Sequence, residues 1–193
     1  MAHLDLQDDE TLVSVVQRYR VYALFTKERI PLWTCLLKWC LRHRQGYPVR
    51  FTHSLLAVQD MTQELVMFYE MSFYDGMEVY TQDYETVQYD NQQFQLTISS
   101  GTFFGCNIET VYDAVDVTTQ VQEDIGYLWY KHYTNKRLTP LTLLTHMFKG
   151  CADKVTWTCT GIVQVLLSMP VYTAFINPLT PDELRATLID NQQ

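Results

Sequence analysis

Apolar side chains recur at helical spacing through the first part of the chain. In residues 9–25 they follow a 3.6-residue period behind an acidic start, which predicts a first helix. Pro31 suits the first turn of a second helix, which Gly46 ends. The stretch "THSLLAVQDMTQELVMFYEMSFYDG", residues 52–76, gives a third periodic run. We therefore expect three consecutive helices that form a small bundle.

After Gly76 the pattern changes to short runs rich in β-branched and aromatic residues, separated by turn-like segments. The predicted strands are "MEVYTQ", "YETVQY", "QFQLTIS", "TVYDAVDVT", "YLWYKHY", "VTWTCT" and "IVQVLL". A short helix is expected from Pro140. A terminal helix is expected from Pro181 to Ile189, because Thr180 and Glu183 have the spacing of a capping box.

The predicted fold class is α+β, with an N-terminal three-helix bundle packed on a C-terminal antiparallel β-sheet region. In domain terms, residues 1–76 form a helical subdomain, and residues 77–193 form an antiparallel β subdomain with a short C-terminal helix. Neither internal repeats nor a Pro/Ser-rich linker separate the two parts. We therefore expect them to share an interface.

Charge and cysteine content narrow the classes of function. Acidic residues outnumber basic ones by 22 to 14, for a formal net charge of -8, and the basic residues are scattered. This balance argues against direct nucleic-acid binding. The five cysteines cannot all pair internally and none lie in a CxxC motif, which is typical of reduced thiols. No signal peptide and no apolar run long enough to span a membrane are evident.

The second predicted helix carries two cysteines and two tryptophans. On a helical wheel Cys40 belongs to the apolar face, and Cys35 lies well over 90° away, so the two thiols and His43 do not converge on a metal ion. Trp39 falls on the basic side, beside Lys38 and Arg42. It either lies over a neighbouring element or anchors a protein partner, since tryptophan and arginine are enriched at interface hot spots.

Candidate catalytic chemistry is sparse. No nucleophile elbow, phosphate loop or HExxH motif occurs, so we expect a protein that is not an enzyme and has no catalytic residues, cofactor or metal. A small hydrolase would have to combine Cys151 or Cys106 with His132 or His146. That hypothesis stays open as a minor alternative.

Several strings resemble the amino-terminal transactivation domain of the papillomavirus early regulatory protein. Trp33 and Gly46 correspond to a helix-two tryptophan and the glycine at that helix's end. "SLLAVQDMTQELVMFYEM" and "MEVY" are similar to the family's third helix and next strand. Further similar strings are "QFQLTISSG", "TVYDAVDV", "GYLWY" and "MFKGCADKVTWTCTGIVQVLLSMPV", the last with Phe148, Ala152, Trp157, Gly161 and Pro170 in corresponding places.

The resemblance implies a non-enzymatic regulatory module acting in the host nucleus. Its partners would be the viral replicative helicase and a host bromodomain chromatin protein, with a homodimer also open. In that family an arginine and a glutamate on helix two and an isoleucine on helix three make the contacts. The corresponding positions here are Leu37, Trp39 and Met67, and Lys38 and Arg42 are further candidates for the partner-binding surface.

A different class of function is also compatible with the sequence. A virion-associated or accessory viral protein would self-associate through its aromatic β-sheet instead of recruiting a helicase. Tyrosine is abundant, with 13 residues, and "YLWYKHY" places aromatic side chains on both faces of one predicted strand.

Overall fold

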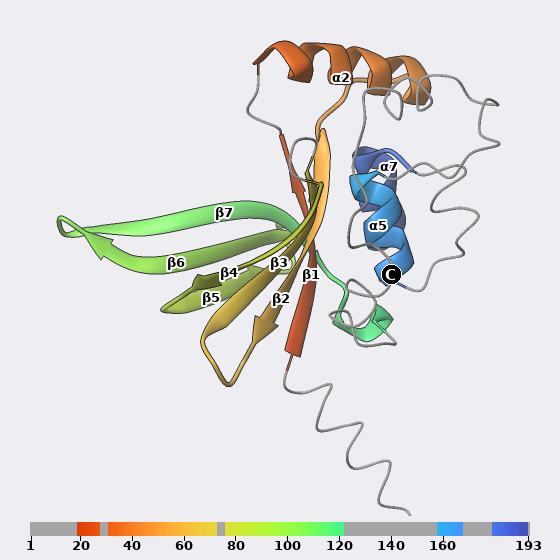
Figure 1. Ribbon diagram of the computed structural model, residues 1–193. Coiled ribbons are helices and arrows are strands. Elements are labelled where there is room, and N and C mark those ends of the chain that lie inside the picture. The colour runs from red at the N-terminus through yellow and green to blue at the C-terminus, as the bar shows by residue number, and fades with distance from the viewer. Residues whose placement is uncertain (1–18, 28–30, 73–75, 122–157, 168–178, 193) are drawn as a thin grey trace, which may run out of the picture.

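The computed structural model describes residues 19–27, 31–72, 76–121, 158–167 and 179–192. Seven strands and three α-helices account for most of these residues (Figure 1). The strands are β1 (Tyr19–Thr26), β2 (His53–Asp60), β3 (Leu65–Ser72), β4 (Gly76–Asp83), β5 (Thr86–Asp90), β6 (Gln95–Phe103) and β7 (Cys106–Asp116). The helices are α2 (Pro31–Gln45), α5 (Cys159–Leu166) and α7 (Pro181–Asp190), with a 3-10 turn, η1, at Thr118–Gln120.

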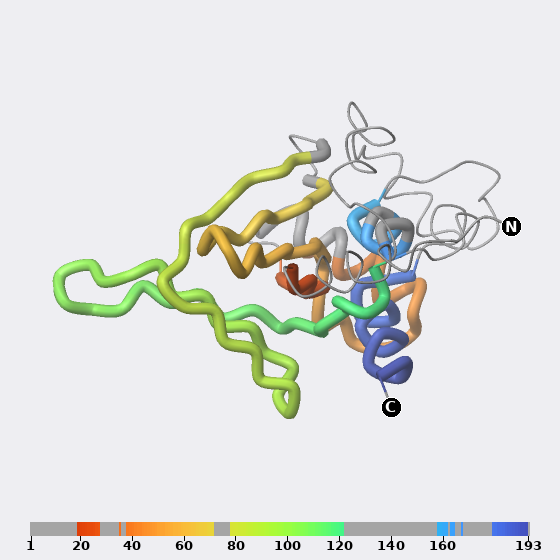
Figure 2. Tube along the Cα trace, turned by 90° about the horizontal axis from the view of Figure 1, so that it is seen from below, coloured from red at the N-terminus to blue at the C-terminus, as the bar shows by residue number. Residues whose placement is uncertain are grey.

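The strands form one antiparallel sheet in the order β4-β3-β2-β1-β7-β6-β5. Strand β1 is central, with Ala23 opposite Leu56 of β2 on one side and Val115 of β7 on the other. The sheet is strongly curved, and the β6–β7 hairpin extends away from the helices (Figures 1 and 2). Strand β3 pairs with β4 throughout its length. The sheet therefore includes strands from both sides of residue 76, where the sequence predicts a change from helices to strands.

Two hairpins use the same turn chemistry. The Asp60 carboxylate accepts a hydrogen bond from the Thr62 N–H, and the Asp90 carboxylate accepts one from the Gln92 N–H. Each turn ends in a residue with positive φ, Glu64 in the first turn and Phe94 in the second. Such Asp side chains mimic a backbone turn and compete with helix formation. The Asp60 turn therefore separates β2 from β3.

The inner strands are buried on both faces of the sheet. In β1, Val21, Ala23 and Phe25 belong to one hydrophobic cluster, and Tyr22 and Leu24 belong to another on the opposite face. The same division runs through β2, in which every residue is buried. Strands buried on both faces lack the regular alternation of apolar and polar residues.

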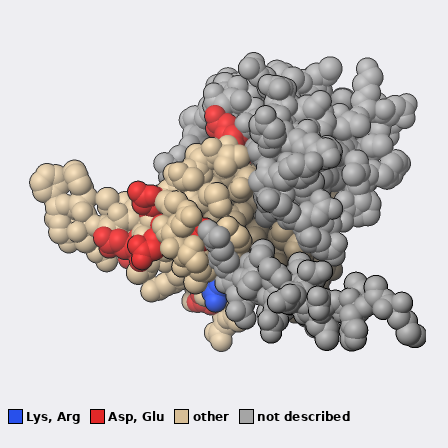
Figure 3. Space-filling model, turned by 60° about the horizontal axis from the view of Figure 1, so that its bottom comes forward, with Lys and Arg blue, Asp and Glu red and all other residues tan. Residues whose placement is uncertain are grey.

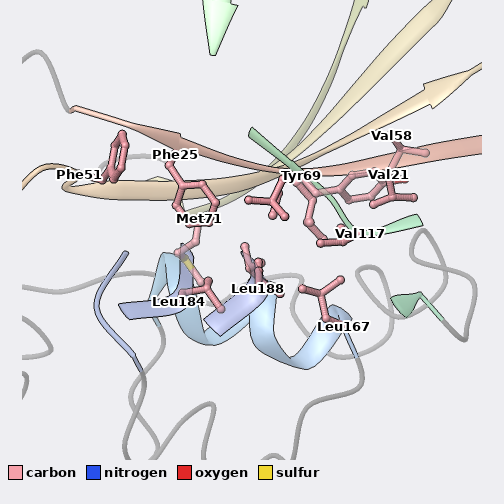
Figure 4. Packing of buried hydrophobic residues seen from close by; sticks show 14 residues of the cluster. Val21, Phe25, Phe51, Val58, Tyr69, Met71, Val117, Leu167, Leu184 and Leu188 are labelled. Atoms are coloured by element: carbon pink, nitrogen blue, oxygen red, sulfur yellow. The ribbon is translucent and has the colours of Figure 1, made fainter. Parts of the chain in front are cut away.

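Helices α5 and α7 cover one face of the sheet. Leu167, just after α5, and Leu184 and Leu188 of α7 point toward residues such as Met71 of β3 and Val117, which follows β7 (Figure 4). The predicted capping box of α7 is confirmed, because Thr180 Oγ1 accepts from the Glu183 N–H at 3.2 Å while the Glu183 carboxylate accepts from the Thr180 N–H at 2.8 Å. The helix that the sequence places at Pro181 is therefore present.

The predicted three-helix bundle is wrong for the part of the chain that the structure describes. Only the second helix, α2, is present as expected. The described end of the first predicted helix is β1, and the third predicted helix is the β2–β3 hairpin. The reason is that buried strands place apolar residues at nearly every position, and such a run also contains every helical spacing.

The sheet prediction for the later part is confirmed for β4 to β7. The segment "IVQVLL", predicted as a strand, instead lies largely in helix α5. The predicted strand "YLWYKHY" and the helix from Pro140 lie outside the described residues.

Candidate active site

His53 is the first residue of β2 and is buried, with 8% of its surface exposed. Its Nε2 lies 2.8 Å from Oε1 of Glu70, which comes from the neighbouring strand β3. An ionised carboxylate can only accept hydrogen bonds, so Nε2 carries the proton that it donates to Glu70. The other ring nitrogen, Nδ1, is left to interact with a second group.

The thiol of Cys159, the first residue of α5, lies close enough to the His53 side chain that each group shifts the pKa of the other. The helix begins here because Thr158 acts as its cap: Thr158 Oγ1 accepts a hydrogen bond from the Gly161 N–H at 3.0 Å. A thiol in the first turn of a helix lies at the positive end of the helix dipole, which favours its thiolate form. Helix α5 packs against β2 and β3, and this packing brings the thiol to His53.

The electrostatics of the three groups are coupled. Burial alone would raise the pKa of the Cys159 thiol, but the His53 charge and the hydrogen bonds from His53 and Ser54 outweigh burial and lower that pKa. Burial would likewise lower the pKa of His53, but Cys159 and Glu70 outweigh it and raise the pKa to about 10. The hydrogen bond from His53 holds the pKa of Glu70 below its ordinary value. All three shifts favour a thiolate, an imidazolium and a carboxylate.

Ser54 adds two polar groups beside the sulfur. Its backbone N–H and its hydroxyl lie near the thiol and both act to lower the pKa of Cys159. The Ser54 side chain is completely buried, and its Oγ has no hydrogen-bond partner among the described residues. Its hydroxyl therefore remains available to negative charge at the Cys159 position.

The arrangement of Cys159, His53 and Glu70 has the connectivity of a nucleophile, a base and an orienting group. Such triads are recognised by geometry and roles rather than by their order in the sequence. In such a triad Cys159 would supply the nucleophile, His53 would give and take a proton, and Glu70 would fix the orientation and tautomer of the ring. Chemically, the arrangement can attack the carbonyl carbon of an amide or ester.

The partner-binding residues predicted from the sequence lie elsewhere. Lys38, Trp39 and Arg42 are exposed on α2, with Trp39 57% exposed and stacked on the His43 ring. Leu37 also lies in α2, but its side chain is not among the described ones. Met67 is half-buried in β3 and packs against the cluster beneath α5 and α7, so it is not on a third helix.

The candidate catalytic cysteines and histidines named from the sequence are not those of this site. Cys106 is exposed at the start of β7, while Cys151, His132 and His146 lie outside the described residues. Sequence reasoning missed His53, Glu70 and Cys159. One local signal was available: Thr158 and Cys159 precede an apolar run, which fits a capped helix that starts with a thiol.

The prediction that Cys40 belongs to the core is confirmed, since it is only 3% exposed. Within the described residues, no group of three or more His, Cys, Asp or Glu side chains is arranged to hold a metal ion. In the same part of the chain, the α-helices are too short or too polar to cross a membrane.

No family model, curated protein or solved structure matches the chain. The comparisons therefore assign it to no family, and its function has to be argued from its own residues.

Proposed function

We propose that this protein is a thiol-dependent hydrolase that cleaves an amide or ester bond, with Cys159 as nucleophile, His53 as acid and base, and Glu70 as the group that orients His53. The observation that carries the proposal is the 2.8 Å hydrogen bond between His53 and Glu70, together with the position of the Cys159 thiol, which is close enough to His53 that the two groups shift each other's pKa. Structural cysteines in apolar surroundings have raised pKa values, whereas reactive ones lie beside a cation or a helix N-terminus. Cys159 has both neighbours.

The reaction follows from the positions of the three groups. The Cys159 thiolate attacks the carbonyl carbon, and the S–C bond forms as the C–N or C–O bond to the leaving group breaks. The imidazolium of His53 donates its Nδ1 proton to the departing nitrogen or oxygen. His53, now neutral, takes a proton from water that attacks the thioester, and the C–S bond breaks to release a carboxylic acid and regenerate the thiolate.

The surface charge adds information about the substrate. On the face that Figure 3 shows, the described residues present several acidic side chains and little basic charge, in line with the net charge of -8. Such a surface repels polyanions. A neutral or cationic acyl substrate is therefore favoured over a nucleic acid or a strongly anionic one.

The decisive experiment combines thiol labelling with a substrate panel. The intact protein is treated with iodoacetamide at pH 6, the modified cysteine is identified by mass spectrometry, and hydrolysis of peptide amides and of p-nitrophenyl esters is followed. We expect selective labelling of Cys159, hydrolysis of at least one substrate, and loss of both in Cys159→Ser. A matched control, Cys106→Ser, should keep both.

Two outcomes would overturn the proposal. One is equal labelling of Cys159 and of the exposed Cys35 and Cys106 at pH 6, because it would mean that Cys159 is not activated. The other is hydrolysis that persists at full rate in a folded Cys159→Ser variant, because it would place the chemistry elsewhere.

A second candidate function is favoured by the exposure of Trp39. A tryptophan that is 57% exposed between the exposed basic residues Lys38 and Arg42 fits a protein-binding surface. The identities implied by the resemblance, a viral replicative helicase and a bromodomain chromatin protein, stay predictions, as do the nuclear location and the homodimer. The described residues lack the helical bundle on which that family's contacts depend.

Capture experiments test this second candidate. The intact protein and its Trp39→Ala variant, matched in thermal stability, are used as baits in nuclear extract and against purified replication helicases. Specific loss of a helicase or chromatin protein with Trp39→Ala would support recruitment. Equal capture by both baits, or capture by neither, would count against it.

A further inference from the structure

Glu70 has a second hydrogen-bond partner besides His53. The hydroxyl of Tyr80 donates to Oε2 of Glu70 at 3.0 Å, while His53 is bound to Oε1. Tyr80 lies on β4, at the edge of the sheet, and 43% of its surface is exposed. The two oxygens of the carboxylate are thus held from two different strands, one buried and one at the surface.

The ring of Tyr80 is itself held in place. It stacks on Phe68 with centroids 5.0 Å apart and an interplanar angle of 15°. Phe68 lies directly opposite Tyr80 in the β3–β4 register and is fully buried. Cross-strand aromatic pairs of this kind stabilise a sheet and restrict ring motion. The hydroxyl therefore reaches Glu70 from a fixed direction.

We propose that Tyr80 is a positioning residue of the active site, which keeps Glu70 ionised and oriented toward His53 and so extends the pH range over which Cys159 is reactive. The proposal rests on the hydrolase function proposed above and deepens it. A hydrogen bond donated to a carboxylate favours its charged form. Without that bond, Glu70 would protonate at higher pH and could rotate away from the imidazole.

The surrounding groups agree with this role. The pKa of Glu70 is lowered first by His53 and further by the Tyr80 hydroxyl. The pKa of Tyr80 is raised by burial and by the charge of Glu70, so Tyr80 stays protonated and remains a donor through the neutral range. Glu78 on its own strand and Tyr112 of β7 also raise the pKa of Tyr80. Neither of these two groups carries a positive charge.

The test is the pH profile of Cys159 alkylation by iodoacetamide in the parent protein and in Tyr80→Phe. This change removes only the hydroxyl and keeps the ring that stacks on Phe68. We expect the acidic limb of the Tyr80→Phe profile to move to higher pH by about half a unit, the order of one neutral hydrogen bond, with the plateau rate kept within about twofold. Where a substrate is known, kcat at low pH should fall more than KM rises.

Tyr89→Phe is the matched control. The Tyr89 hydroxyl is also hydrogen-bonded, accepting from the Asp116 N–H at 3.2 Å, but it belongs to β5 at the other edge of the sheet. This variant should leave the profile unchanged. In a Glu70→Gln background, Tyr80→Phe should have no further effect, because both residues act through the same carboxylate.

The possible results separate the two proposals. An unchanged acidic limb in Tyr80→Phe, with Cys159 still activated in the parent, overturns the role of Tyr80 alone. A parent profile in which Cys159 titrates like an ordinary thiol overturns the hydrolase proposal itself. An equal shift in Tyr89→Phe would overturn the role of Tyr80, because it would show a general effect on the sheet.

Discussion

Cys40 of α2 is buried and Cys159 of α5 is partly buried, and the pKa values of their thiols shift in opposite directions. The pKa of Cys40 is raised, because burial dominates and its strongest opposing interaction is with its own backbone. The pKa of Cys159 is lowered, because an imidazole, a serine and a helix N-terminus surround the sulfur. Burial alone makes a thiol inert. Reactivity requires polar groups that other elements bring to it.

The two regions also differ in what their surfaces offer. Helix α2 presents Trp39, Lys38 and Arg42 to solvent, where a protein partner could contact them directly. Helix α5 has its described side chains mostly inward, against β2 and β3, where His53 and Glu70 lie. Helix α2 therefore offers the proposed protein-binding surface, and helix α5 holds the thiol of the proposed catalytic site.

The largest effect is expected on the rate of hydrolysis, from a substitution that leaves the Cys159 thiol, like the Cys40 thiol, without a neighbouring imidazole. His53→Gln removes the group that stabilises the thiolate, so the remaining burial should raise the pKa of Cys159. We expect hydrolysis to fall by about 10³-fold or more, the scale seen when one member of a catalytic triad is lost. His43→Gln is the matched control on α2, since this histidine is exposed and its ring stacks on the exposed Trp39. Similar losses in both variants would contradict the assignment.

The next effect concerns the packing that holds α5 over the sheet. Leu184 of α7 is completely buried in the cluster that α5 shares (Figure 4). Leu184→Ala should reduce the free energy of unfolding by about 2–5 kcal/mol, from lost burial plus a cavity. Urea denaturation measures it, with Val111→Ala as a control because Val111 is 57% exposed on the β6–β7 hairpin. A cost below about 1 kcal/mol would mean that α7 is not packed as described.

A smaller effect is expected from Glu70, and it should depend on pH. Because its pKa in the folded protein is lowered, the stability that Glu70 contributes is present above its ordinary value near 4.5 and is lost as pH falls through the folded value. Glu70→Gln should therefore lower the free energy of unfolding by about 2 kcal/mol at pH 6, the order of a hydrogen bond to a charged group. Denaturation from pH 6 to pH 3 should show this difference narrowing. Glu109→Gln, on the exposed part of β7, should change the free energy of unfolding at pH 6 by no more than about 0.5 kcal/mol, as is usual for surface substitutions.

The smallest effect is expected at Trp39. More than half of its surface is exposed, and its ring contact is with the exposed His43. Trp39→Ala should change the free energy of unfolding by no more than about 0.5 kcal/mol, as is usual for surface substitutions. Thermal and urea denaturation check this. A loss of several kcal/mol would show that Trp39 packs against part of the chain and is not free to bind a partner.

Two helix ends that depend on neighbouring residues were predicted correctly. Pro31 and Gly46 bracket α2 closely, and the Thr180 and Glu183 side chains form the expected capping box. The turn at Asp90 was recognised from its polar composition. The equivalent turn at Asp60 was missed, because the flanking runs of β2 and β3 are apolar enough to satisfy a helical period.

The sequence by itself determined the local boundaries of α2 and α7, the strand character of β4 to β7 and the acidic surface, because each depends on residues close together in the chain or on composition alone. Only the tertiary structure decided that residues 53–72 form two strands, since the choice between helix and sheet there depends on pairing with β1 and β4. It alone brought His53, Glu70 and Cys159 together from two strands and a helix. No local sequence pattern predicts that these three side chains lie together, because their proximity depends on how α5 packs against the sheet.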